Sequence, residues 1–343
     1  MITSNLFRGR WLLTQLLVIL FSLLVVRNTY GQQPSRIYVY DGFTATVNSN
    51  VQIFPSLTVH QTEPEISVHP SNPSHLVASA NIGENEPPAG RFISTSAGSS
   101  WYGTDAEPTA DALGDPGTAV DLNGHMYVSY LVDGGGIGLS KTTNLGQTWE
   151  HRVTGATGAD MPHLTIDNSG GQHSGNLYIT YRGTEGSINP IYFMRSTDGG
   201  DSWISIQNIS GSSGFTNANG ARIQVGVNGE LFAVWNYDAE TLGSQRIGFN
   251  VSSDGGATWG TPRTIFSIQA IPPVLKSGTS RWAVNSLPSL AYDRSSGPHR
   301  GWLYVAWNQK DNPPAGSDPD ILLSRSTDSG ITCPRHRWCC LRR

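Results

Sequence analysis

The chain has 343 residues, of which 14% are charged and 9% aromatic, with 39 Gly, 20 Pro and 10 Trp. This composition excludes a disordered, charge-rich chain, and a long coiled coil is excluded because Ala, Glu, Lys and Leu do not dominate. Residues 32–332 hold 15 of the 22 Lys and Arg and all 26 Asp and Glu, so their net charge is −11. Such an acidic body disfavours nucleic acid and anionic lipid as partners.

Residues 1–31 have the pattern of a secretory signal peptide. Two arginines precede an apolar run over 11–26, and the small residues Thr29 and Gly31 stand before a cleavage point. A membrane anchor is the alternative, but the run is short for a span of about 20 residues. We therefore expect a secreted chain, extracellular or periplasmic, that is cleaved near Gly31 and has no membrane span after cleavage.

Residues 32–60 form a separate N-terminal segment with two strand-like stretches. These are RIYVYDG (36–42) and VQIFPSLTV (51–59). Both are rich in aromatic and β-branched residues, which favour strands. The segment either pairs with an edge strand and helps to close a ring of sheets, or forms a short entry hairpin.

An octapeptide occurs five times along residues 61–332, and its last copy extends to residue 333. Each copy follows a strand, a polar turn, a second strand and a third strand, and a fourth strand begins at the final Trp. Four strands per unit, with no helical periodicity, predict an all-β propeller, whose blades need roughly 40–50 residues plus loops. The copies are STSAGSSW (94–101), TTNLGQTW (142–149), STDGGDSW (196–203), SSDGGATW (252–259) and STDSGITC (326–333).

The residues of the octapeptide have a mechanical role in a hairpin turn. Its Asp accepts hydrogen bonds from turn amides, its Gly takes a positive φ, and its Trp offers a large apolar face to pack between blades. We therefore assign a structural role to the residues of the two complete copies, which are Ser196, Asp198, Gly200, Trp203, Ser252, Asp254, Gly256 and Trp259.

This motif resembles the Asp-box, or BNR repeat, of sialidases (neuraminidases) and related β-propellers. The third and fourth copies match in full, whereas Ser96, Asn144 and Cys333 replace a motif residue in the others. The resemblance implies a sialidase-like β-propeller of four-stranded antiparallel blades, six when complete, with the box away from the active face. Because Asp-box propellers also include receptors and assembly factors, function has to be argued from the site.

The chain ends in a basic tail that breaks the repeat. Residues 333–343 read CPRHRWCCLRR, with no strand alternation, and hold all three cysteines. We interpret this tail as the result of a frameshift or truncation, which would remove the outer strand of the fifth blade and a sixth blade. A natural basic tail is the alternative, although the cysteine spacing matches no familiar zinc site.

Polar groups suited to sugar chemistry occur in the loops that a propeller gathers at the mouth of its channel. The resemblance implies three arginines that clamp a substrate carboxylate, a Tyr–Glu nucleophile pair and an Asp acid. The sequence departs from the family because PEISVHP (64–70) has no arginine where the first clamp arginine is expected. The candidate catalytic residues are Arg182, Glu185, Arg222, Tyr237, Asp238 and Arg281, and rim carboxylates include Asp111, Asp115 and Asp160.

These features predict a sialidase-type exo-glycosidase, monomeric and without an organic cofactor, that acts on or binds extracellular glycans or glycoconjugates. The alternative is a non-catalytic scaffold propeller that binds a protein, a peptide or a cation through its acidic rim. Asp311, Asp318 and Asp320 offer hard oxygen ligands for Ca²⁺, although their spacing also suits an ordinary acidic surface loop.

Overall fold

The computed structural model describes residues 36–40, 43–47, 51, 53, 61–83, 89–105, 108–211, 216–238, 245–271, 286–311 and 320–331. The chain divides into two compact units, residues 1–53 and 54–343. In the first unit, β1 (Arg36–Tyr40) pairs antiparallel with β2 (Phe43–Val47). The expected leader over 1–31 and the tail over 333–343 lie outside the described residues. No helix that could cross a membrane occurs in the part of the chain that the structure describes.

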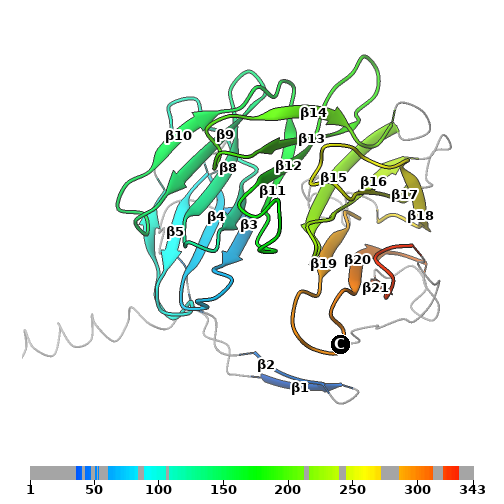
Figure 1. Cartoon of the computed structure of the whole chain (residues 1–343), viewed down its shortest axis with the longest axis horizontal. Coiled ribbons are helices and arrows are strands. Elements are labelled where there is room, and N and C mark those ends of the chain that lie inside the picture. Colours follow the sequence, from blue (N-terminus) through cyan, green and yellow to red (C-terminus); the bar gives the residue numbers. More distant parts are fainter. Residues whose placement is uncertain are drawn as a thin grey trace, which may run out of the picture. The chain divides into compact units, whose positions relative to one another are not determined.

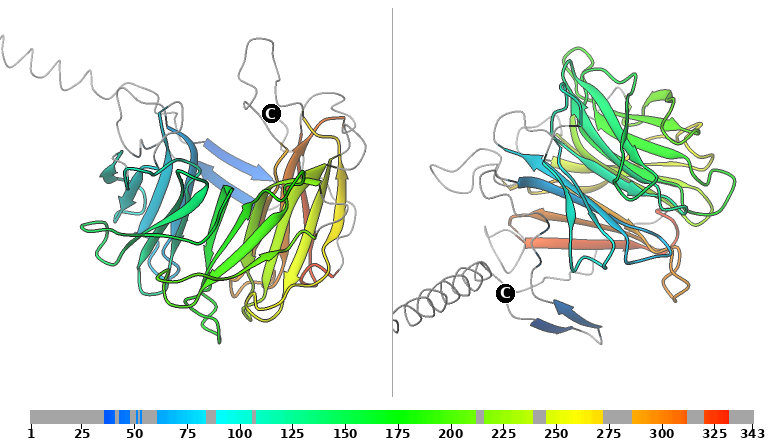
Figure 2. Two further views of the ribbon diagram at one scale, coloured as in Figure 1. Left: turned by 90° about the horizontal axis from the view of Figure 1, so that it is seen from above. Right: turned by 90° about the vertical axis from the view of Figure 1, so that its left-hand side faces the viewer.

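The second unit is a propeller of five antiparallel sheets, each of which follows the chain as a simple meander. Figure 1 shows these blades succeeding one another in chain order around a central axis, and Figure 2 shows them from two further sides. The first blade consists of β3 (Gln61–Val68), β4 (Leu76–Ile82), β5 (Arg91–Ser94) and β6 (Tyr102–Thr104), and the second of β7 (Gly117–Val120), β8 (Met126–Val132), β9 (Gly136–Thr142) and β10 (Glu150–Val153). The third consists of β11 (Asp160–Ile166), β12 (Leu177–Arg182), β13 (Ile191–Ser196) and β14 (Ile204–Asn208), and the fourth of β15 (Thr216–Val225), β16 (Leu231–Asp238), β17 (Gln245–Ser252) and β18 (Arg263–Ile268). The fifth consists of β19 (Ser289–Tyr292), β20 (Leu303–Gln309) and β21 (Asp320–Ser326).

The all-β propeller expected from the repeat is therefore confirmed. Four blades have four strands, and the fifth has three within the described residues. The predicted sixth blade and the truncation stay predictions. On the two blades that a sixth blade would flank, apolar side chains are exposed, namely Ile66 and Val68 on β3 and Ile321 and Leu323 on β21.

The hydrophobic core is a series of layers between successive blades. One layer joins the second and third blades through residues such as Leu139 and Ile179. The next joins the third and fourth through Phe193 and Trp235, and another joins the fourth and fifth through Phe249. The middle strands have both faces covered, so β4 is buried along its whole length. This burial on two sides is why the second strand of each unit reads as a nearly continuous apolar run.

Within the described residues, the octapeptides occupy equivalent positions at the end of the third strand of every blade, and the third and fourth copies share one turn geometry. In the third copy the Ser196 hydroxyl donates to the Asp198 carboxylate (2.8 Å), and the Gly200 amide donates to the Ser196 hydroxyl (2.8 Å). In the fourth copy Ser252, Asp254 and Gly256 make the same bonds, at 2.8 and 2.9 Å. The hydrogen bonds of the Ser202 hydroxyl and amide lower the pKa of Asp198 to about 2.

The glycine and the tryptophan of the octapeptide attach each blade to the one before it. Trp259 of the fourth blade lies edge-on to Phe193 of the third, with ring centroids 5.0 Å apart. Gly256 has φ +79°, and a Cβ atom there would collide with the same Phe193 ring. Trp203 packs in the same way against the layer between the second and third blades. The repeat therefore sets the spacing between blades as well as the hairpin within each blade.

Candidate active site

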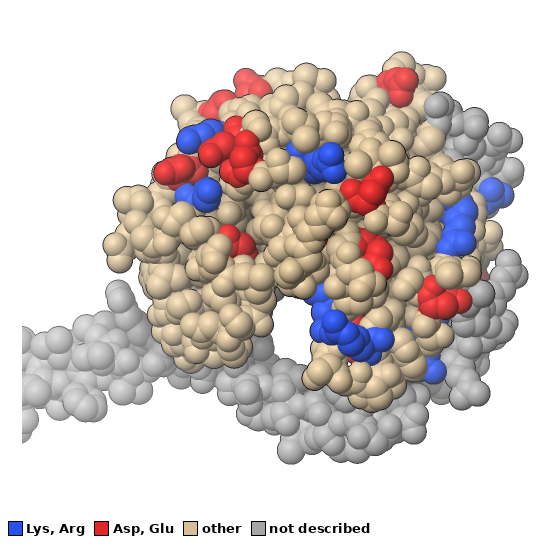
Figure 3. All heavy atoms as spheres, viewed as in Figure 1, with Lys and Arg blue, Asp and Glu red and all other residues tan. Residues whose placement is uncertain are grey.

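The first strands of the five blades line a central channel with two cavities. A cavity of about 270 Å³ lies at the mouth where these strands begin, and a cavity of about 480 Å³ lies further along them. Glu65, Arg222 and Ser289 line both cavities, so the two are consecutive. On the face in Figure 3 the unit is hollowed, with basic side chains at the edge of the opening.

The backbone at the mouth has the same unusual conformation in successive blades. Glu63, Asp115 and Met161 have φ values of 51°, 53° and 49°, and each precedes a proline that begins the inward part of the first strand. Residues before proline normally adopt extended conformations, so a positive φ is strained there. The strand pairing is also irregular beside Glu63 and Met161. Such irregularities turn side chains out of the sheet pattern and commonly occur next to active sites.

Two carboxyl groups, Glu63 and Asp115, meet at this mouth and share a hydrogen bond. Asn81 of β4 connects them: its side-chain NH₂ donates to Glu63 Oε2 (3.2 Å), and its Oδ1 accepts from the Asp115 amide (2.8 Å). Burial, the hydrogen bond to Glu63 and the negative charges of Glu63 and Asp160 raise the pKa of Asp115 to about 7. Asp115 is therefore a carboxyl group that keeps its proton at mildly acidic pH.

A third carboxylate completes the group. Asp160 begins β11 and receives a hydrogen bond from Arg182 Nη1 at 2.7 Å. The amide of the adjacent Met161 donates to Asp115 Oδ2 (3.2 Å), which fixes the Asp115 carboxyl between the first and third blades. The mouth thus holds one carboxyl with a raised pKa, and next to its lining residue Met161 lies a carboxylate paired with a guanidinium. Environments that differ in this way separate acid and base roles in carboxyl-based catalysis.

The inner end of the mouth is closed by an ion pair that crosses the channel. Arg222 Nη1 of the fourth blade lies 3.0 Å from Glu65 Oε1 of the first blade. Among the described residues, the charged groups that line the mouth cavity are Glu63, Glu65, Asp115 and the cation Arg222. This lining therefore has an excess of two negative charges when all three carboxyl groups are ionised, and of one when Asp115 is protonated.

Two of the sequence-predicted arginines reach this region, each already paired with a carboxylate. Arg222 lines the mouth and pairs with Glu65, and Arg182 pairs with Asp160 beside it. Arg281 lies outside the described residues. Of the three arginines expected to bind a substrate carboxylate, the two that are described are therefore both neutralised by carboxylates of the protein.

The other predicted catalytic residues within the described ranges are not among the residues that line the two cavities. Tyr237 is 1% exposed in the layer between the third and fourth blades, and its hydroxyl is bonded to Thr264. Asp238 accepts a hydrogen bond from Asn217 (3.1 Å). Glu185 is exposed and accepts from the Tyr192 hydroxyl (3.2 Å). Among the described candidates, Arg222 lines the mouth, and Arg182 is connected to it through Asp160.

The acidic loop suggested for Ca²⁺ is only partly described. Asp318 lies outside the described residues, whereas Asp311 has its Oδ2 atom 3.7 Å from Lys310 Nζ. Within the ranges that the structure describes, no three His, Cys, Asp or Glu side chains group as metal ligands. The Ca²⁺ site stays a prediction.

Sequence reasoning missed Glu63 and Asn81, although a signal for the mouth was present. Four of the five blades begin their first strand with a residue followed by proline, as in EPEIS, DPGTA, MPHLT and LPSLA. This repeated dipeptide marks the position at which Glu63 and Asp115 turn into the channel. Asn81, the last residue but one of the buried strand β4, carries no such local signal.

Comparisons with known proteins agree on the fold. No protein-family model matches the chain, and no curated protein matches it. Among solved structures, the α-L-arabinanase of Penicillium chrysogenum with arabinobiose is 16% identical, with 88% of this chain and 85% of that chain covered and a TM-score of 0.55. The leech intramolecular trans-sialidase is 12% identical (80% and 59% covered, TM-score 0.55), and the α-L-arabinofuranosidase of Fusarium graminearum is 13% identical (81% of each covered, TM-score 0.53).

At these identities the likeness establishes the fold. The chain is a sialidase-like β-propeller, an architecture that it shares with these glycoside-acting enzymes, and it spans about three fifths of the length of the leech enzyme. The fold expected from the resemblance is therefore confirmed, and the chemistry has to follow from the mouth itself.

Proposed function

We propose that the protein is a glycoside hydrolase that acts at the mouth of the channel through its carboxyl groups. The observation that carries this proposal is the placement of Asp115 in a cavity of about 270 Å³, hydrogen-bonded to Glu63, with a pKa of about 7. Glycoside cleavage needs one carboxylic acid that is protonated near the working pH and a second carboxylate. Both occur here on the first strands of neighbouring blades.

The residues divide into an acid and its partners. Asp115, whose pKa its hydrogen bond to Glu63 helps to raise, donates its proton to the leaving glycosidic oxygen as the glycosidic C–O bond breaks. A water molecule then adds to the resulting oxocarbenium ion and returns a proton to Asp115. Asp160, held by Arg182, supplies the negative charge that a developing oxocarbenium ion requires. Asn81 fixes the Glu63 side chain relative to the Asp115 backbone, because its amide group forms one hydrogen bond with each.

The charge of the mouth favours a neutral sugar over a sialic acid. A substrate carboxylate would enter a cavity with an excess of negative charge, and it would have to displace Glu65 from Arg222 or Asp160 from Arg182. We therefore propose exo-cleavage of a terminal neutral sugar in place of the sialidase-type reaction that the resemblance implies. With the secretion expected from residues 1–31, the substrate is an extracellular glycan.

The test is hydrolysis of a panel of 4-methylumbelliferyl glycosides, containing neutral pentosides and hexosides together with a sialoside. We expect turnover of a neutral glycoside, with activity that falls as the pH rises past about 7. The Asp115→Asn variant should lose a factor of about 10²–10⁴ in kcat, while Asp111→Asn, at an exposed carboxylate of the same connection, should keep it. Turnover of the sialoside alone would restore the sialidase assignment, and no turnover of any substrate would favour the scaffold alternative.

A further inference from the structure

The larger cavity, which lies beyond the Glu65–Arg222 ion pair, has a different character from the mouth. It has a volume of about 480 Å³ and is lined by the first strands of all five blades. Its charged lining residues are Glu65, Arg222 and Arg294. Because Glu65 and Arg222 neutralise each other, Arg294 is the remaining charge among the described lining residues, and Asp167, which does not line the cavity, partly offsets it.

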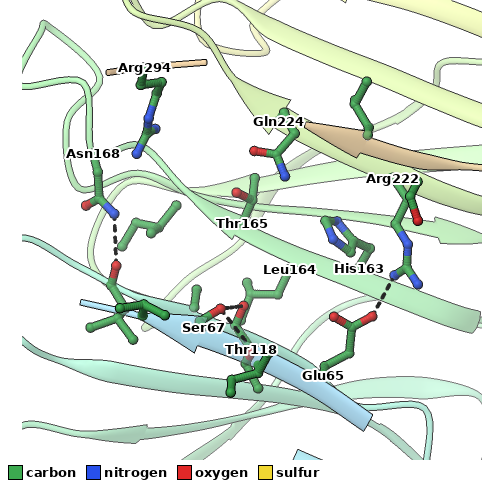
Figure 4. Close-up of a pocket in the computed structure, with 17 residues that line it drawn as sticks. Glu65, Ser67, Thr118, His163, Leu164, Thr165, Asn168, Arg222, Gln224 and Arg294 are labelled. Carbon is green, nitrogen blue, oxygen red and sulfur yellow. Dashed lines mark hydrogen bonds and ion pairs between the residues drawn. The ribbon is translucent and has the colours of Figure 1, made fainter. Parts of the chain in front are cut away.

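Polar side chains from successive blades point into this cavity without partners. Figure 4 shows Thr165, Gln224 and Arg294 around the same space, from the third, fourth and fifth blades. Within the described residues, the side chains of these three make no hydrogen bond or ion pair. Beside them, Asn168 donates to the Val120 carbonyl (2.9 Å), whereas its buried Oδ1 atom has no partner in this part of the chain. Donors and acceptors are thus left for a bound molecule.

Arg294 is the group that decides the charge of such a molecule. Partial burial lowers its pKa, and the negative charge of Asp167 opposes that shift. Asp167 is buried behind the lining and its Oδ1 accepts the Ser169 amide (2.7 Å). It therefore stabilises the cationic form of Arg294 while the planar guanidinium keeps its N–H donors toward the cavity. A guanidinium fork matches a carboxylate with two parallel hydrogen bonds.

We propose that this cavity is a second ligand site, which takes a small sugar acid with one carboxylate. The carboxylate binds the guanidinium of Arg294, and the hydroxyl groups bind Thr165, Gln224 and the free acceptor of Asn168. We propose a ligand with a single negative charge because the negative charge of Asp167, which acts on Arg294, disfavours a dianion such as phosphate. The site does not depend on the proposed hydrolase activity, because Asp115 and Glu63 do not line it.

Isothermal titration calorimetry of the full chain with D-glucuronate and D-glucose tests this site, since the two probes differ at one carboxylate. We expect glucuronate to bind at least tenfold more tightly than glucose, and inorganic phosphate to bind more weakly than glucuronate. Arg294→Gln should weaken glucuronate binding at least tenfold and Arg294→Lys should weaken it less. Arg152→Gln, at an exposed arginine of β10, should leave it unchanged. Circular dichroism at each step confirms that the variants are folded.

Three results would overturn the proposal. The first is no measurable glucuronate binding to the wild-type chain. The second is equal binding to wild type and to folded Arg294→Gln or Arg294→Lys. The third is loss of binding in Arg222→Gln with full binding in Arg294→Gln, which would place the anion on Arg222 in place of Arg294. Because every readout is binding, failure here leaves the hydrolase assay untouched, and loss of hydrolase activity leaves this result untouched.

Discussion

Replacing Asp115 by Asn isolates the energetic consequence of its burial. Burial and the neighbouring Glu63 and Asp160 carboxylates raise the pKa of Asp115 from 3.8 to about 7. The folded chain therefore keeps a proton that the unfolded chain releases at lower pH, so the free energy of unfolding falls as the pH rises from about 4 to about 7. Above pH 7 both states have lost the proton and the penalty is constant. Asn does not titrate, so the variant escapes this penalty.

Linkage between these two pKa values gives a loss of roughly 3 kcal/mol between pH 5 and pH 8 for the wild-type chain. Because Asp115 keeps partial contact with solvent, we expect a measured value of about 1–3 kcal/mol. The assay is urea unfolding, followed by tryptophan fluorescence, of wild type and Asp115→Asn at both pH values. Between pH 5 and pH 8, the free energy of unfolding of the variant should increase by that amount relative to wild type, whatever the variant's stability at pH 5.

The comparison across pH cancels the titrations that the two proteins share. Asp111→Asn, at an exposed carboxylate, should show no such gain and serves as the control. A difference between wild type and Asp115→Asn that stays constant from pH 5 to pH 8 would refute the reasoning. Asp115 would then titrate as an ordinary carboxylate, and its role as the acid at the mouth would fall with it.

Three further predictions concern the repeat and the channel. Trp259→Ala should lower the free energy of unfolding by about 2–3 kcal/mol, since the half-buried ring packs on Phe193 of the preceding blade. An unchanged midpoint of urea unfolding would contradict the role of Trp259 between blades. Asp198→Asn should be less stable than wild type at pH 6, and this difference should vanish as the pH falls from about 4 to about 2. The reason is that the Asp198 carboxylate, whose pKa is lowered by its hydrogen bonds, stabilises the fold only while it is ionised. A difference that persists at pH 2 would contradict this. Arg222→Gln should cost about 1–2 kcal/mol by leaving Glu65 unpaired, and adding Glu65→Gln should recover most of it; additive losses would show that the two side chains are not coupled.

The blade architecture could be predicted from the sequence because its determinants are local. The octapeptide closes a hairpin with bonds between residues two to four positions apart, as between Ser196, Asp198 and Gly200. The octapeptide recurs in register five times, twice in full and three times in part, so one mechanical explanation serves for the repeat. The catalytic assignments carried over from the resemblance had no such local determinant. The structure places Tyr237 in a layer between blades and pairs Arg182 and Arg222 with carboxylates.

The sequence by itself determined the all-β class, the meander of each blade and the position of its turns, since alternation and turn chemistry act within a few residues. Only the tertiary structure decided which carboxyl groups meet. Glu63, Asn81 and Asp115 come from two blades, and Asn81 and Asp115 are 34 residues apart. Their contact follows from how two sheets pack around the channel and from strained residues that turn inward. The pKa of Asp115 is a product of that burial and of the negative charges that packing brings beside it.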